Sequence, residues 1–208
     1  MQIRFADRRP DGDYALVLPV AGKARPALAS LGTARPAIDA ALQRQRFEGD
    51  ASSAAELFFA EGKDTRRLLV IGTGDGTKPA DAAEKLGGTV SARLQLSGEK
   101  RAVVDLTGLG YDADAAAKVA LAAALRSWRY DRYRTMLKNK QKPTLEQIVI
   151  VGAGAGADKR WTERWAPVLE GVALTRELVT EPANIIYPET FVERVRASLE
   201  GTGIEIEV

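Results

Sequence analysis

Two residue types are missing altogether: the sequence contains no cysteine and no histidine. The absence of cysteine excludes a disulfide framework, a thiolate nucleophile, an iron–sulfur cluster and a cysteine-based zinc site. The absence of histidine excludes a Ser-His-Asp triad, an imidazole base and an HExxH metal site. Catalysis by this chain would therefore have to rest on carboxylates, lysine, tyrosine, hydroxyl groups or backbone amides.

The sequence also lacks an excess of charge and any long hydrophobic run. Thirty Lys and Arg residues stand against 28 Asp and Glu residues, which gives a net charge of +2 and does not by itself imply a polyanionic partner. No apolar run approaches the length of a membrane span, and residues 1–10 lack the apolar core of a signal peptide. These absences predict a cytoplasmic protein without a membrane partner.

The 208 residues suffice for one to two domains. Short β-branched runs bounded by Gly or Pro predict strands that are buried on both faces. These runs are residues 15–20, 68–72, 102–106 and 147–152, and residues 51–60 form a further strand or hairpin arm.

Helical patterns separate these runs. They cover residues 36–47, residues 78–96 with a break expected at Gly87 and Gly88, and residues 113–130 with Asp112 as N-cap. The alternation of strands and helices predicts an α/β domain with a mostly parallel sheet.

The last fifty residues have a different pattern. Residues 158–180 show helical spacing, and Glu181 ends that helix because it precedes Pro182. A second helix is expected from Pro188 to Leu199, followed by a strictly alternating strand over residues 204–208. A chain that ends on a new helix–strand unit suggests that a further domain follows.

Two glycine loops are candidate nucleotide sites. Residues 72–76 and residues 152–157 each follow a predicted strand, and the second loop formally matches G-x-G-x-x-A. A dinucleotide site requires the loop to open into a helix, with an acidic residue ending a second strand about 20 residues later. No strand follows the second loop at that distance, which favours ordinary turns over a nucleotide site.

A basic and aromatic stretch is the second candidate. Its pattern fits a solvated helix end, a protein interface or a nucleic-acid site, and these three interpretations stay open. The cations are Arg126, Arg129, Arg132, Arg134, Lys138, Lys140 and Lys142, opposed by Asp131 and interleaved with Trp128, Tyr130 and Tyr133.

Asp105, Asp112 and Asp114 form a loose cluster of carboxylates after one strand. A two-metal site needs several carboxylates that converge at close range. Asp112 and Asp114 are better explained as residues that begin a helix. We therefore predict no metal site here, and no credible active site elsewhere in the chain.

Two stretches resemble a known family. Residues 175–191 (TRELVTEPANIIYPETF) are similar to the segment R-D-L-V-N-x-P-A-N-x-x-x-P-E-x-F of the leucyl aminopeptidases, also called cytosol aminopeptidases or peptidase family M17. Residues 128–135 (WRYDRYRT) resemble the same family's Y-x-F-D-x-Y-K-T, with matching order and spacing. Glu177, Thr180 and Tyr130 depart from the family pattern, where Asp, Asn and Phe stand.

The resemblance implies a three-layer, macro-domain-like α/β domain with a mostly parallel central sheet over residues 1–157. It also implies that residues 158–208 form a linker helix and the start of a C-terminal catalytic domain. In the family that domain holds two divalent metals (zinc, manganese or magnesium) on Lys, Asp and Glu residues of motifs such as N-T-D-A-E-G-R. This motif is not in the sequence. No catalytic, cofactor-binding or metal-binding residue is therefore expected in this chain.

The leading hypothesis is a non-catalytic N-terminal domain of a metal-dependent leucyl aminopeptidase, which removes N-terminal residues from peptides. The resemblance implies packing against its own catalytic domain and assembly into a hexamer, with the basic stretch facing a neighbouring domain or subunit. Two alternatives remain: a macro-like module for a nucleotide-type ligand at the glycine loops, and a DNA-binding accessory domain using residues 126–142.

Overall fold

The computed structural model describes residues 1–23 and 25–208. Its centre is a six-stranded sheet in the order β1-β6-β5-β2-β4-β3. Only β3 runs antiparallel to its neighbour, so the sheet is mostly parallel, as the sequence predicts. The strands are β1 (Gln2–Ala6), β2 (Ala15–Val20), β3 (Ala54–Glu61), β4 (Asp64–Gly72), β5 (Arg101–Asp105) and β6 (Gln147–Val151).

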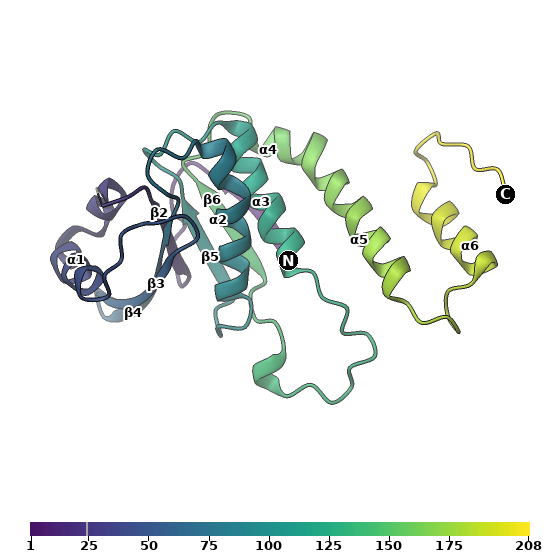
Figure 1. Ribbon diagram of the computed structural model, residues 1–208, viewed down its shortest axis with the longest axis horizontal. Helices are drawn as coiled ribbons and strands as arrows, with labels where there is room; N and C mark the ends of the chain where they lie inside the picture. Colours follow the sequence, from purple (N-terminus) through teal and green to yellow (C-terminus); the bar gives the residue numbers. More distant parts are fainter. Residues whose placement is uncertain (24) are drawn as a thin grey trace.

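Helical segments cover both faces of this sheet and make three layers (Figure 1). The 3₁₀ segment η1 (Pro26–Ala34) and helix α1 (Arg35–Arg44) pack on one face, where Leu28 and Leu42 are fully buried. Helices α2 (Pro79–Leu94) and α3 (Ala113–Ser127) pack on the other face. The four predicted β-branched runs are the buried centre between these layers, because parallel strands covered on both faces contact no water. The α/β fold class is confirmed.

Helix α2 corrects one detail of the prediction, because it continues through Gly87 and Gly88 without a break. Gly87 lies where α2 crosses α3, and a Cβ atom there would stand 2.1 Å from the carbonyl oxygen of Val119. The glycine is thus used for close helix packing and not for a helix end. In α3, the Asp112 side chain accepts a hydrogen bond from the Ala115 amide at 2.8 Å, as expected of an N-cap.

Strand β1 is missing from the sequence prediction. Its residues alternate between exposed and half-buried and carry Gln2 and Arg4, so they lack the continuous apolar run of the central strands. The strand forms because Gln2–Ala6 pairs in parallel with Gln147–Val151 at the sheet edge. Such long-range pairing leaves little signal in the local sequence.

Residues 157–208, named here the C-terminal arm, leave the sheet and extend beyond α3 (Figure 1). The arm contains α4 (Ala157–Arg160), the π-helical turn η3 (Trp161–Trp165), α5 (Ala166–Thr180) and α6 (Pro188–Leu199). The predicted helix boundaries at Glu181 and Pro188 are confirmed. Among the described residues, no helix has both the length and the apolar character needed to cross a membrane.

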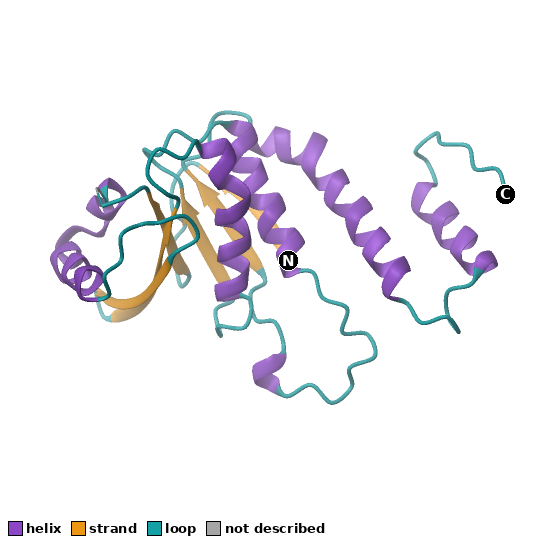
Figure 2. Cartoon of the chain, in the orientation of Figure 1, coloured by secondary structure: helices purple, strands orange, loops and turns teal. Residues whose placement is uncertain are grey.

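The predicted strand over residues 204–208 is wrong for this structure, which has no regular secondary structure there (Figure 2). An isolated strand cannot satisfy its backbone groups, and no neighbouring strand lies beside this segment in the described part of the chain. The alternating pattern of Ile and Glu residues is present, but a partner sheet for it is not.

Candidate interdomain surface around Glu181

The C-terminal arm exposes several large apolar side chains. Neither α5 nor α6 has a buried residue. Val179 is 81% exposed, and Phe191 and Tyr187 are about half exposed. Helices with amphipathic patterns normally bury their apolar stripe, so these faces mark a surface suited to contact with another protein unit.

One buried carboxylate ties the arm to the basic stretch. The side chain of Glu181, which directly follows α5, is fully buried. It accepts hydrogen bonds from Arg132 Nη1 at 2.8 Å and from the Tyr133 hydroxyl at 2.5 Å. Arg194 Nη2, on α6, donates a third at 2.9 Å. Three segments that are distant in sequence therefore meet at a single side chain.

These contacts keep Glu181 ionised. The hydrogen bond from Tyr133 is the main cause, with Arg194 adding a favourable charge, and together they overcome burial and lower the pKa of Glu181 to about 2. The same hydrogen bond raises the pKa of Tyr133 to about 12. Glu181 is thus a permanent anion at neutral pH, suited to hold two guanidinium groups in place and unsuited to act as a proton donor.

Neighbouring contacts extend this junction along α5. Arg176 Nη1 donates to the carbonyl oxygen of Leu125 at 2.7 Å, at the end of α3, and its guanidinium lies 5.7 Å from the centre of the Trp128 ring. Glu177 lies 3.4 Å from Arg194. The two stretches that resemble the aminopeptidase motifs are therefore in direct contact.

The rest of the basic stretch does not form one continuous cationic site. Asp131 pairs with Arg129 at 2.6 Å and with Arg134 at 3.7 Å, while Arg132 is engaged by Glu181. In the described part of the chain, Lys138, Lys140 and Lys142 have no ion pair. About half of the cations are thus paired with carboxylates that position the loop. This pairing favours a packing role for the aromatic part of the stretch, residues 128–133.

The first glycine of each glycine loop is packed against neighbouring backbone. A Cβ atom on Gly72 would stand 2.1 Å from the carbonyl oxygen of Asp50, and one on Gly152 would stand 2.4 Å from the Thr107 amide. A hollow of about 310 Å³ beside residues 152–157 is also lined by Asp7 and Asp158. These carboxylates would repel a phosphate, so the geometry favours close-packed turns over a nucleotide site.

The three candidate carboxylates serve three separate purposes. Asp105 pairs with Arg9 at 2.6 Å, and Asp112 caps α3. Asp114 pairs with Lys118 at 3.1 Å and with Arg160 at 3.2 Å. Across residues 1–23 and 25–208, no group of three acidic side chains is placed to hold a metal ion. These residues do not fit the two-metal centre that the resemblance implies for a catalytic domain.

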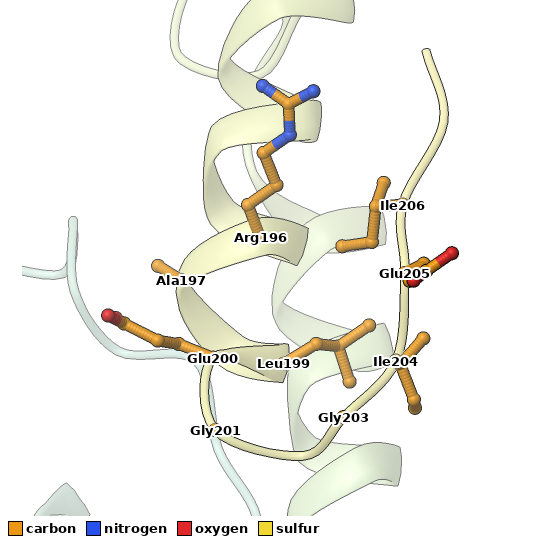
Figure 3. Close-up of a pocket in the computed structure, with 9 residues that line it drawn as sticks. All are labelled: Arg196, Ala197, Leu199, Glu200, Gly201, Gly203, Ile204, Glu205 and Ile206. Carbon is orange, nitrogen blue, oxygen red and sulfur yellow. The ribbon is translucent and has the colours of Figure 1, made fainter.

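A hollow of about 860 Å³ lies between the end of α6 and the residues that follow it. Figure 3 shows Leu199 and Ile206 pointing into this space, while Glu205 points away from it. The hollow exists because the alternating residues run beside the helix without pairing to a sheet. The hollow could be filled by packing against another segment. Its polar side chains, Arg196, Glu200 and Glu205, point in different directions and do not converge on one point (Figure 3).

Comparison with known proteins decides the family. The family model "Cytosol aminopeptidase family, N-terminal domain" matches residues 22–137, which is more than half of the chain. The chain belongs to the cytosol aminopeptidase family. It is 36% identical over 183 residues to a probable cytosol aminopeptidase of Rhodopseudomonas palustris, covering 85% of this chain and 36% of that protein. A probable cytosol aminopeptidase of Xanthobacter autotrophicus is 38% identical over 176 residues, covering 83% and 35%.

Solved structures agree with this assignment. A tomato leucine aminopeptidase variant superposes with a TM-score of 0.77 at 25% identity, covering 95% of this chain and 42% of that one. The bottromycin maturation enzyme BotP, solved in complex with Mn, has a TM-score of 0.66 at 21% identity and shares the fold. This cytosol aminopeptidase domain spans about a third of the length of the curated relatives it matches.

Sequence reasoning missed the central residue of this surface. Glu181 was predicted only to end a helix, and Arg194 was not among the candidate site residues. The signal that could have found Glu181 was its place inside residues 175–191, which resemble the same family as the Arg- and Tyr-rich residues 128–135.

Proposed function

We propose that this chain acts as the non-catalytic N-terminal domain of a metal-dependent leucyl aminopeptidase that removes N-terminal residues from peptides. The observation that carries the proposal is the meeting of residues 128–135 and 175–191 at Glu181, within a chain that matches the family's N-terminal domain. The domain's role is to pack against the catalytic domain and to support assembly of the enzyme.

We divide the chain into an α/β domain over residues 1–157 and a connecting unit over residues 158–208. The division is supported by the end of the sheet at Val151 and by the direction of the arm away from α3. The exposed apolar residues of α5 and α6 would lie against the catalytic domain. The unpaired residues 204–208 would join a sheet of that domain, where their apolar side chains would face its core and their Glu side chains would face solvent.

The chemistry of such an enzyme would be supplied by two divalent metal ions, which activate water and polarise the scissile carbonyl. We assign those metals to residues outside this chain, since Asp105, Asp112 and Asp114 are engaged in a cap and in ion pairs. The chain's own contribution is positional. Glu181, Arg132 and Arg194 would set the direction in which the connecting unit leaves the α/β domain.

The full-length enzyme would be a cytoplasmic homo-oligomer, with the hexamer implied by the family resemblance as its expected form. The Tyr- and Arg-rich part of residues 128–135 suits an interface, where these residue types are the usual anchors. The two alternatives weighed from the sequence gain no support from the comparisons. A nucleotide site is disfavoured because the first glycine of each loop is packed against backbone, and a DNA site is disfavoured because the cations are partly paired with carboxylates.

A peptidase assay tests the proposal directly. The purified 208-residue chain, supplied with Mn²⁺ and a leucine amide substrate, is expected to show no turnover above the metal-only blank. The physical reason is that no three acidic groups among the described residues converge on a point where a metal could sit. Metal-dependent hydrolysis that copurifies with the chain through two chromatographic steps would overturn it.

A further inference from the structure

A crevice of about 400 Å³ lies at the carboxyl ends of the parallel strands, away from the Glu181 surface. Strand β2 is flanked by β4 on one side and by β5 on the other, so the chain's connections diverge between β2 and β5. In open α/β sheets, ligands bind in the crevice beside such a switch point. Leu18 of β2 and Asp105 of β5 both line this crevice.

The crevice has an apolar part and a charged part. Leu18, Val151, Pro26 and Ala27 supply apolar surface from two strands and from η1. Arg8 and Arg9 supply positive charge, and Asp7 and Asp105 supply negative charge. Its volume falls at the small end of the range of about 300–1,000 Å³ that is typical of small-molecule sites. A ligand with a few apolar carbons and a compact polar head would fit.

The charged part has hydrogen-bonding capacity to spare. Asp105 is only 7% exposed, and its oxygens accept one bond each, from the Thr107 amide at 2.9 Å and from Arg9 Nε at 2.6 Å. Arg9 Nη2 donates to Ser30 Oγ at 2.7 Å, and Nη1 has no partner within the described residues. Each carboxylate oxygen can accept a second bond, and a guanidinium has five N–H donors.

The charged side chains of the crevice favour a ligand that carries both a positive and a negative group. A phosphate or simple anion would be repelled by Asp7 and by the buried Asp105, and a simple cation would be repelled by Arg8 and Arg9. A zwitterion satisfies both, with its ammonium on Asp105 and its carboxylate on the arginines. We propose that this crevice binds a free α-amino acid with an apolar side chain.

The proposal adds a site to the domain that is separate from packing and assembly. Free apolar amino acids are also the product class of the peptidase reaction proposed above, and this link alone rests on the proposed function. Binding to the crevice can be measured on the 208-residue chain without any peptidase activity. Failure of one proposal therefore leaves the other standing.

The first test compares three ligands on the wild-type chain by nuclear magnetic resonance titration of the isotope-labelled protein. L-leucine is expected to shift the amide signals of Arg9, Ser30 and Thr107 in a saturable way. Isocaproate lacks the ammonium and isoamylamine lacks the carboxylate, so each should bind at least about tenfold more weakly. Equal affinity for all three, or no saturable shift with leucine at millimolar concentration, would overturn the proposal.

The second test uses a matched pair of variants on η1. Ala27→Phe places a ring in the crevice, whereas Ala29→Phe adds the same ring at an exposed position that does not line it. Leucine binding should fall at least tenfold in the first variant and stay within twofold in the second. Retained binding by a folded Ala27→Phe protein would contradict the proposed site, and the ligand comparison decides the matter if that variant fails to fold.

Discussion

At the scale of single residues, the molecule relies on buried anions held by several donors. Glu181 has three side-chain donors from two other segments, and Asp105 has one guanidinium and one backbone amide. A buried carboxylate is stable only when such donors replace its water. The removal of one charge should therefore disturb every segment that shares it.

The substitution Glu181→Gln tests this at the arm. We expect the amides of α6 and of residues 128–135 to lose at least about tenfold of their hydrogen-exchange protection, because an amide cannot hold two guanidinium groups as an anion does. The α/β core should keep its thermal midpoint. Glu193→Gln, at an exposed position on α6 without an ion pair in the described part of the chain, is the control and should change neither readout.

The same residue gives a pH dependence with a defined sign. The pKa of Glu181 is lowered in the folded chain from 4.5 to about 2. Its contribution is therefore complete above the unfolded value and is lost as the pH falls through the folded one. Protection of α6 should decline between about pH 4.5 and pH 2 in the wild type, and this decline should be absent in Glu181→Gln.

At the scale of elements, packing overrides local propensity. Helix α2 runs through two glycines because its contact with α3 stabilises it, and Gly87 permits the close approach. Strand β1 forms with weak local signal because β6 offers it an edge. Residues 204–208 carry a strong strand pattern and form none, since no edge is offered to them in the described part of the chain.

The glycine pair of α2 provides a matched prediction. Gly87→Ala should reduce the free energy of unfolding by about 1–3 kcal/mol, since its methyl group would overlap the backbone of α3. Gly88→Ala should increase it by about 0.4–1 kcal/mol, because nothing lies within 4 Å of its Cβ and alanine favours the helix. Urea unfolding of both variants measures the difference, and a shared sign would contradict this account of the α2–α3 contact.

At the scale of the whole molecule, a closely packed three-layer core is followed by an arm that leaves apolar side chains exposed. The core buries all of β2 and most of β5 and β6, while α5 and α6 bury no residue. The arm is attached by Ala157 and Trp161, which pack on the core, and by polar contacts at Glu181 and Arg176. A surface held in this way is suited to a partner that covers its apolar residues, in keeping with the proposed packing on a catalytic domain.

The variant Val179→Asp tests that role. Because Val179 is 81% exposed, the substitution should change the thermal midpoint of the 208-residue chain very little. In the full-length enzyme that we propose, the same charge would lie in an interface and should lower both the thermal midpoint and the fraction of assembled oligomer seen by sedimentation. An unchanged midpoint and unchanged assembly there would show that this face is not covered.

The sequence by itself determined the α/β class with a mostly parallel sheet, the buried central strands, the N-cap of α3 and the helix ends at Glu181 and Pro188. These features depend on local patterns: continuous apolar runs, a side-chain cap and the steric effect of proline on its neighbours. The resemblance in residues 128–135 and 175–191 also indicated the family that the comparisons confirm.

Only the tertiary structure decided the pairing of β1, the continuity of α2, the irregular path of residues 204–208 and the meeting of two motifs at Glu181. It also placed Arg9 against Asp105, 96 positions apart, in one crevice. Each of these outcomes depends on which backbone edges and which charged side chains lie close together in the folded chain. The local sequence does not predict these contacts, because they are set by the packing of segments that are far apart in the chain.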